Sequence, residues 1–410
     1  MEDNKIKRQR IYKVIMLLVL TATITFMLTT ILLYKKFEVA YQTNNLSSES
    51  TLNSNQISLI KVLEKFKAIL EQKYIGDINE NDLIEGAIKG YVDGIGDPYT
   101  EYLTKEEMQE FTEETNSEYV GIGVYVANNT ADNTILVVGV MKSSPALEAG
   151  MQAGDIIEKV DGVTYTGEQL NEATKNLKGV EGTTVQVTVV RDGKEIELTI
   201  TRKKITVEHV ESQMLNNNIA YIQVDSFDSG VERSFEEQIT ALKNQGAKGI
   251  IIDLRSNGGG IVDEATGIAD LFLEKNATIL ITKSKDAEEQ TIKSKNNPII
   301  TNIPVVVLVN EGTASASEIL AGALKENYGA TIVGKTTYGK GVIQTLYNLA
   351  DGSGLKITTD EYYTPNHNKI NKIGITPDVE VDLTIDENGY YETSMDKDAQ
   401  LLKAIEILNK

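Results

Sequence analysis

The sequence predicts a multi-domain α/β protein with an N-terminal transmembrane helix, a helical segment, a small β-rich domain and a larger α/β core. Three stretches support this fold class: an apolar run over residues 14–34, a hairpin pattern around Asp192-Gly193, and a strand–helix–strand pattern over residues 305–333. Strands joined by a helix typically pair in parallel, so we expect a parallel sheet in the core.

Residues 1–36 are expected to form a basic cytoplasmic stub and a transmembrane anchor. The apolar run is about long enough to cross a bilayer as a helix, and basic residues before it favour an external remainder of the chain. These residues are Lys5, Lys7, Arg8, Arg10 and Lys13. A cleaved signal peptide is the alternative, but the run is long for that role and lacks a small-residue cleavage site. The expected location is the cell membrane, single-pass, with the rest of the chain outside the cytoplasm.

The rest of the chain divides into segments of different character. Residues 37–56 are rich in Ser, Asn, Gln and Thr and are predicted to form a flexible stalk. Residues 57–115 show the apolar spacing of helices, and residues 116–203 alternate strand patterns with turns, including the two-residue hairpin turn at Asp192-Gly193. Residues 204–385 are predicted to form the larger α/β core, and residues 386–410 are predicted to form a helical tail.

The composition excludes several kinds of protein. A net charge of −20 leaves no basic surplus for nucleic acid. The chain has no cysteine, which removes disulfides, thiolate catalysis and cysteine metal ligands together. With only two histidines, a zinc hydrolase is not expected either. We therefore expect neither a metal nor a cofactor.

Ser315 is the candidate nucleophile. It follows the apolar strand pattern of residues 305–309 and precedes a helix pattern, so it lies at a strand-to-helix turn. The free N–H groups and positive dipole at such a turn favour an anion, and the backbone N–H of Ala316 offers an oxyanion site.

Lys340 is the candidate base. Glycines flank it on both sides, which lets the loop turn sharply and approach other groups closely. A lysine is a base only when neutral, and burial lowers its pKa in that direction. Gln344 lies four residues further on and can orient the amine, which gives a variant of the catalytic triad.

The run TASASEILAGAL followed by TTYGKGVIQ resembles the carboxyl-terminal processing proteases, also called tail-specific proteases. The resemblance covers nearly all of the chain beyond the first 58 residues, and it implies a ClpP/crotonase-like ββα core. It implies Ser315 as the nucleophile, Lys340 as the base and Gln344 as the residue that orients the lysine.

Two departures from the family pattern accompany this resemblance. Thr313 stands where the family usually has serine, and Gly258 stands where it usually has proline. By the same resemblance, Gly258 or Gly259 supplies the second oxyanion N–H beside Ala316.

The β-rich segment resembles a PDZ domain. The resemblance implies that Gly121, Ile122, Gly123 and Val124 form its carboxylate-binding loop. Such a loop offers successive N–H groups to a terminal carboxylate, while the peptide adds as a strand to an open sheet edge.

The sequence therefore predicts a membrane-anchored serine endopeptidase that cleaves protein or peptide substrates with exposed C-termini through a Ser–Lys dyad, and a homodimer is possible. The alternative is a catalytically silent PDZ scaffold that binds peptides. A crotonase-like enzyme acting on thioesters is a third class; it would need a coenzyme A site and no PDZ domain.

Overall fold

A computed structural model describes residues 54–383, 385 and 394–410 of the chain. The chain separates into two units, Met1–Leu83 and Ile84–Lys410. In the first unit, helix α2 (Ser54–Lys73) exposes apolar side chains along its length, among them Leu59, Leu63 and Phe66. Helix α3 (Glu80–Asp93) begins in the first unit and continues into the second.

The β-rich domain is a six-stranded antiparallel sheet in the order β3-β4-β5-β7-β8, with β6 paired to β5. Its strands are β3 (Val124–Asn129), β4 (Thr134–Val140), β5 (Ile156–Val160), β6 (Val163–Thr164), β7 (Thr184–Arg191) and β8 (Lys194–Thr201). The predicted hairpin is confirmed, since Arg191 pairs with Lys194 across the turn. Alternate residues of β7 are buried, and they form the domain core together with α6 (Leu170–Leu177).

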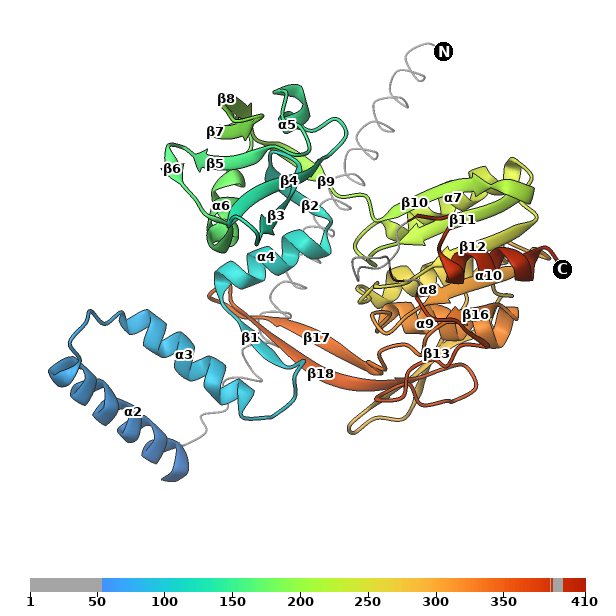
Figure 1. Cartoon of the computed structure of the whole chain (residues 1–410). Helices are drawn as coiled ribbons and strands as arrows, with labels where there is room; N and C mark the ends of the chain where they lie inside the picture. Colours follow the sequence, from blue (N-terminus) through green and yellow to red (C-terminus); the bar gives the residue numbers. More distant parts are fainter. Residues whose placement is uncertain (1–53, 384, 386–393) are drawn as a thin grey trace, which may run out of the picture. The chain divides into compact units, whose positions relative to one another are not determined.

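Two helices and a small second sheet accompany this six-stranded sheet. Helix α4 (Lys105–Thr115) precedes it, and the short helix α5 (Pro145–Glu148) lies within it. A two-stranded sheet of β2 (Glu118–Gly121) and β9 (Lys203–Thr206) joins the start and end of the domain. Among the described residues, β3 pairs with β4 alone, so the other edge of β3 is open (Figure 1).

The core of the second unit contains a six-stranded sheet in the order β10-β11-β12-β15-β16-β19. Only the β10–β11 pair is antiparallel. The strands are β10 (Val210–Leu215), β11 (Ile219–Val224), β12 (Gly249–Asp253), β15 (Val305–Val309), β16 (Thr331–Gly334) and β19 (Val379–Glu380). The predicted βαβ unit is confirmed: α9 (Ala316–Ala323) connects β15 to its parallel neighbour β16.

The continuous apolar run of β15 has a physical reason. Val305, Val307 and Val309 enter the larger core, which includes residues of α7 (Val231–Asn244), α8 (Val262–Asp270) and α9. Val306 and Leu308 enter a smaller core with α10 (Ala399–Leu408), which packs along the sheet beside β12 and β16 (Figure 1). Because both faces of the strand are covered, every one of its positions is apolar.

The second unit also contains an antiparallel sheet, whose strands lie before and between those of the core sheet along the chain. Strand β18 (Gly354–Tyr363) pairs with β17 (Val342–Asn348), β13 (Thr278–Ser284) and β1 (Glu101–Leu103), and β14 (Gln290–Lys293) pairs with β13. Strand β1 comes from before the β-rich domain: Glu101 pairs with Lys356. Sequence-distant segments therefore meet in this sheet.

The predicted fold class is wrong in its transmembrane helix. Within residues 54–383, 385 and 394–410, no helix has both the length and the apolar character that a membrane crossing requires. The apolar run on which that prediction depended, and the predicted stalk up to residue 53, lie outside the described residues. The corrected description is a multi-domain α/β chain with a β-rich domain and an α/β core. The predicted domain boundaries stay predictions.

Candidate active site

Ser315 lies at the turn between β15 and α9, immediately before the helix. Its backbone has φ 57° and ψ −119°, a conformation that is rare for a residue with a side chain and occurs at functional sites. Thr313 helps to hold the turn, because its hydroxyl donates to the Leu254 carbonyl at 2.8 Å. The Ser315 side chain is half-buried, so the fold presents a hydroxyl at the end of a buried strand.

Lys340 reaches the same place from the loop between β16 and β17. The Tyr338 N–H donates to the Thr313 carbonyl at 2.9 Å, which fixes this loop beside the serine turn. Burial lowers the pKa of Lys340, and the positive charge of Lys356 lowers it further. A lower pKa makes the neutral amine, which a general base requires, easier to reach than in an exposed lysine.

The ammonium of Lys340 lies over the ring of Tyr99, with Nζ 4.7 Å from the ring centroid. Tyr99 belongs to the segment just before β1. Within the part of the chain that the structure describes, no hydrogen bond joins Lys340 Nζ to Ser315 Oγ or to Gln344. In the described structure, the Lys340 amine therefore lies against the Tyr99 ring and is not hydrogen-bonded to Ser315.

Gln344 lies on β17, and its side-chain amide donates to Thr358 Oγ1 at 3.2 Å. Thr358 in turn accepts nothing from the lysine; its own N–H donates to Thr100 Oγ1 at 3.1 Å. A register shift between Ile343 and Gln344 accompanies this orientation. Gln344 is thus close to the predicted site but is directed toward β18.

A cavity of about 520 Å³ brings the three predicted residues together, because Ser315, Lys340 and Gln344 all line it. Apolar side chains make up much of the remaining wall: Phe111, Ile261, Val262, Val342, Ile343 and Leu346. Such a cavity can accept an extended peptide with apolar side chains. Polar and charged side chains also line it, among them Glu114, Asp228 and Asp263.

The candidate oxyanion donors differ in whether their N–H groups already donate a hydrogen bond. Among the described residues, the Ala316 N–H donates no hydrogen bond, and neither do those of Gly258 and Gly260, which both line the cavity. The Gly259 N–H donates to Asn257 Oδ1 at 2.8 Å. Gly259 nevertheless lies against the nucleophile, since a Cβ added to it would be 2.7 Å from Ser315 Cβ.

The predicted carboxylate-binding loop begins at Gly121, the last residue of β2. Ile122 is buried in the domain core, and Gly123 has a φ of 78°. In the described part of the chain, the N–H groups of Ile122 and Gly123 donate no hydrogen bond, whereas their carbonyls accept from Ala146 and Met141. Val124 begins β3, the strand with an open edge. The loop therefore offers two free N–H groups next to that edge.

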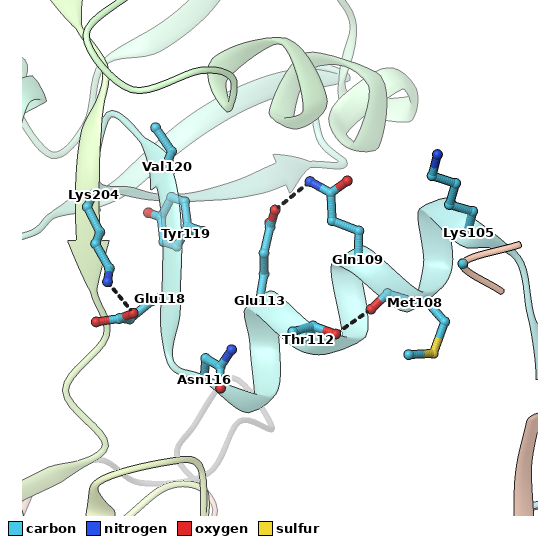
Figure 2. Close-up of a pocket in the computed structure, with 11 residues that line it drawn as sticks. Lys105, Met108, Gln109, Thr112, Glu113, Asn116, Glu118, Tyr119, Val120 and Lys204 are labelled. Atoms are coloured by element: carbon cyan, nitrogen blue, oxygen red, sulfur yellow. Dashed lines mark hydrogen bonds and ion pairs between the residues drawn. The ribbon is translucent and has the colours of Figure 1, made fainter. Parts of the chain in front are cut away.

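A second cavity, of about 470 Å³, lies along α4 and β2 (Figure 2). Two polar contacts lie along it: Lys204 pairs with Glu118 at 2.6 Å, and the Gln109 amide donates to Glu113 at 3.0 Å. None of the residues that line it forms a nucleophile–base pair. The cavity at Ser315 is therefore the candidate active site.

Sequence reasoning missed three residues of the site. Glu318 was given no role, yet its side chain is fully buried and its carboxylate accepts from the Ser315 N–H at 2.9 Å. Tyr99 and Tyr362 both lie within contact distance of the lysine or its backbone. The signal for Glu318 was a carboxylate inside an otherwise apolar helix pattern.

Comparison with known proteins identifies the family of this chain. The chain matches the model of peptidase family S41 over residues 218–381. It matches the PDZ domain over residues 119–201 and the activating protease CtpB N-terminal domain over residues 18–107.

Two similar proteins and one solved structure are named as proteases. The carboxy-terminal processing protease CtpA of Bacillus subtilis is 38% identical over 82% of this chain and 71% of that protein. A probable CtpA-like serine protease of Staphylococcus haemolyticus is 36% identical over 81% of this chain and 66% of that protein. A solved structure of a putative S41 protease from Bacteroides fragilis has a TM-score of 0.51 at 18% identity, covers 82% of this chain and 91% of its own, and shows the shared fold. The chain therefore belongs to peptidase family S41, as a serine-type carboxy-terminal processing peptidase.

Proposed function

We propose that this chain is an endopeptidase that cleaves protein or peptide substrates recognised through their C-terminus, by a Ser–Lys dyad and an acyl-enzyme intermediate. The observation that carries the proposal is the shared cavity, which Ser315, Lys340 and Gln344 all line. Ser315 comes from the turn before α9, whereas Lys340 and Gln344 come from the loop before β17 and from β17 itself. Free N–H groups lie at the same place.

The proposed reaction begins when the Lys340 side chain turns from Tyr99 toward Ser315. Neutral Lys340 takes the hydroxyl proton, and Ser315 Oγ attacks the scissile carbonyl carbon. The Ala316 N–H and one glycine N–H stabilise the oxyanion. Lys340 then gives its proton to the leaving amine, and water hydrolyses the acyl-enzyme in a second step of the same kind.

The sequence predicted Gly258 or Gly259 as the second oxyanion donor, but the Gly259 N–H already donates to Asn257. We therefore propose the N–H of Gly258 or that of Gly260, because both line the cavity and neither donates elsewhere in the described structure. The variant Gly258→Pro separates the two, since proline lacks the N–H. Turnover that survives this substitution assigns the donor to Gly260, and turnover that is lost without loss of folding assigns it to Gly258.

The PDZ domain is proposed to bind the substrate's C-terminus. Two observations support this: the free N–H groups of Ile122 and Gly123, and the open edge of β3 to which a peptide can add as a strand. The terminal carboxylate would lie at the loop, and the preceding residues along β3. Binding there would select chains with exposed ends.

The cellular setting is also proposed. The sequence alone supports action at the cell membrane, with the catalytic part outside the cytoplasm, through its basic residues followed by an apolar run over residues 14–34. A homodimer is supported by the exposed apolar side chains of α2, which include Leu59, Leu63 and Phe66. Apolar surface of this kind is typical of protein–protein contacts.

One observation favours a second candidate, a peptide-binding scaffold without catalysis. Lys340 lies over Tyr99 and makes no bond to Ser315 in the described structure. A chain fixed in this arrangement would bind peptides through its PDZ domain and cleave nothing.

The test compares the full chain with Ser315→Ala and Lys340→Ala on unfolded casein, from about pH 6 to about pH 10, a range that ends near the ordinary lysine pKa. We expect cleavage by the parent alone, rising with pH as the amine loses its proton. Equal cleavage by all three would contradict the assignment. If none cleaves casein even after addition of a peptide with an apolar free C-terminus, the scaffold is the correct function.

A further inference from the structure

Two buried side chains join the backbone of Ser315 to that of Lys340. The first is Glu318, whose side chain has no exposed surface. One oxygen of its carboxylate, Oε2, accepts from the Ser315 N–H and from the Lys340 N–H, each at 2.9 Å. The same atom therefore binds the nucleophile's amide and the base's amide.

The other carboxylate oxygen of Glu318 holds the rest of the lysine loop. Oε1 accepts from the Gly339 N–H at 2.8 Å and from the Thr337 hydroxyl. With four donors directed at it, this carboxylate is satisfied as an anion although burial raises its pKa. Its position fixes the loop relative to the first turn of α9.

The second side chain is Tyr362 on β18, which is also fully buried. Its hydroxyl lies 2.6 Å from the Lys340 carbonyl oxygen and 3.0 Å from the Ser315 carbonyl oxygen. A tyrosine hydroxyl has one proton, so it donates to one carbonyl at a time.

The Lys340 carbonyl is the one that depends on this proton. The Ser315 carbonyl already accepts from the N–H groups of Glu318 and Ile319, at 2.8 and 3.1 Å. In the described structure, the Lys340 carbonyl has no donor other than Tyr362. Removing the hydroxyl would leave this partly buried carbonyl without that donor, and the loop would shift to reach a new one.

We propose that Glu318 and Tyr362 are positioning residues that form one clamp: Glu318 binds the amides of Ser315 and Lys340, and the Tyr362 hydroxyl donates to the Lys340 carbonyl beside the Ser315 carbonyl. Neither side chain touches substrate; each acts through the backbone of the two reacting residues. The clamp sets the separation from which the Lys340 side chain reaches Ser315 Oγ. This inference depends on the proposed Ser–Lys dyad.

The experiment measures kcat and KM of the full chain on a peptide substrate, for the parent, Tyr362→Phe and Glu318→Gln. The matched control is Tyr363→Phe: Tyr363 is the next residue of β18, and its hydroxyl donates to the Glu361 carboxylate at 2.7 Å, away from the site. Glutamine keeps one acceptor oxygen, so Glu318→Gln retains part of the clamp and provides a second variant.

We expect Tyr362→Phe to lower kcat about 10- to 100-fold with KM unchanged, because a displacement on the order of 1 Å has such a cost in rate. Glu318→Gln is expected to lower kcat in the same way, and Tyr363→Phe to keep the parent values. The rate at which a fluorophosphonate labels Ser315 should fall in parallel with kcat. All rates are measured below the unfolding midpoint of every variant, so a loss of folding does not enter them.

Two results separate the failure of this inference from failure of the proposed function. A parent that cleaves the peptide, together with a Tyr362→Phe variant of unchanged kcat or one that alters KM alone, overturns the clamp only. A Ser315→Ala variant as active as the parent, or a parent that cleaves nothing, overturns the proposed function and the clamp with it.

Discussion

Gly259 gives the most direct structural prediction, because a methyl group added there collides with the serine turn. The Cβ of an alanine would lie 2.7 Å from Ser315 Cβ, 2.9 Å from the Ala314 carbonyl oxygen and 3.0 Å from the Ala316 amide nitrogen. These are backbone atoms or a Cβ, so no side-chain rotation relieves the overlap. The φ of 106° at this position is also one that alanine rarely adopts.

The expected loss of stability in Gly259→Ala is the sum of two energetic costs. The unfavourable backbone conformation costs about 1–3 kcal/mol, and the overlap with well-packed neighbours costs about 1–3 kcal/mol more. We therefore expect Gly259→Ala to destabilise the chain by about 2–6 kcal/mol. For a core of this size, that corresponds to a midpoint lower by roughly 5–20 °C.

Gly258→Ala is the matched control for stability. A Cβ at Gly258 meets nothing within 4 Å, and its φ is not in the left-handed region. We expect its midpoint to equal that of the parent. Because the chain has no tryptophan, thermal unfolding is followed by far-UV circular dichroism.

The same substitution should affect catalysis. To accommodate the methyl group, the Ser315 turn must move, and we expect kcat of Gly259→Ala to fall about 10- to 100-fold. The reasoning is refuted if Gly259→Ala unfolds at the parent's midpoint, or if it loses stability while Ser315 reacts with a fluorophosphonate at the parent's rate.

Three further predictions concern charge, aromatic contact and peptide binding. Because the charge of Lys356 lowers the pKa of Lys340, Lys356→Met should raise that pKa and move the rising limb of the pH–rate profile to higher pH. Lys356→Arg should leave the limb in place. Identical profiles for the parent and both variants would contradict this reasoning. Tyr99→Leu removes a cation–π contact worth about 0.5–2 kcal/mol and should raise kcat/KM near neutral pH about 2- to 30-fold, whereas Tyr99→Phe keeps the ring and the parent value. Gly123→Ala would place a Cβ 2.4 Å from Ser144 Cβ, and it should abolish the binding of a peptide with a free C-terminus, measured by calorimetry. Undiminished binding by this variant would exclude a carboxylate-binding role for the loop. So would equal binding of the free and the amidated peptide by the parent.

The parallel core and its turn could be predicted from sequence because their signals are local. The residues of β15 are apolar without interruption since alternate side chains enter two different cores. A strand of this kind, followed by a turn and a helix, places Ser315 at the helix start whatever the rest of the chain does. The glycines around Lys340 gave a second local signal.

The surroundings of the lysine depend on long-range pairing and could not be predicted. Glu101 on β1 pairs with Lys356 on β18, and this contact brings Tyr99 to Lys340. No local pattern near residue 99 encodes a partner so distant in the sequence. Likewise, the register shift at Gln344 depends on how β17 and β18 pair, and it directs the amide to Thr358.

The central claim is that Ser315 is the nucleophile and that Lys340 activates it. The most direct measurement is mass spectrometry of the full chain after reaction with a fluorophosphonate, with the adduct located by peptide mapping. We predict a single adduct on Ser315, formed faster as pH rises and lost in Lys340→Ala. An adduct on another serine, such as Ser317 in the first turn of α9, or labelling of Ser315 at the same rate with and without the Lys340 amine, would contradict the account.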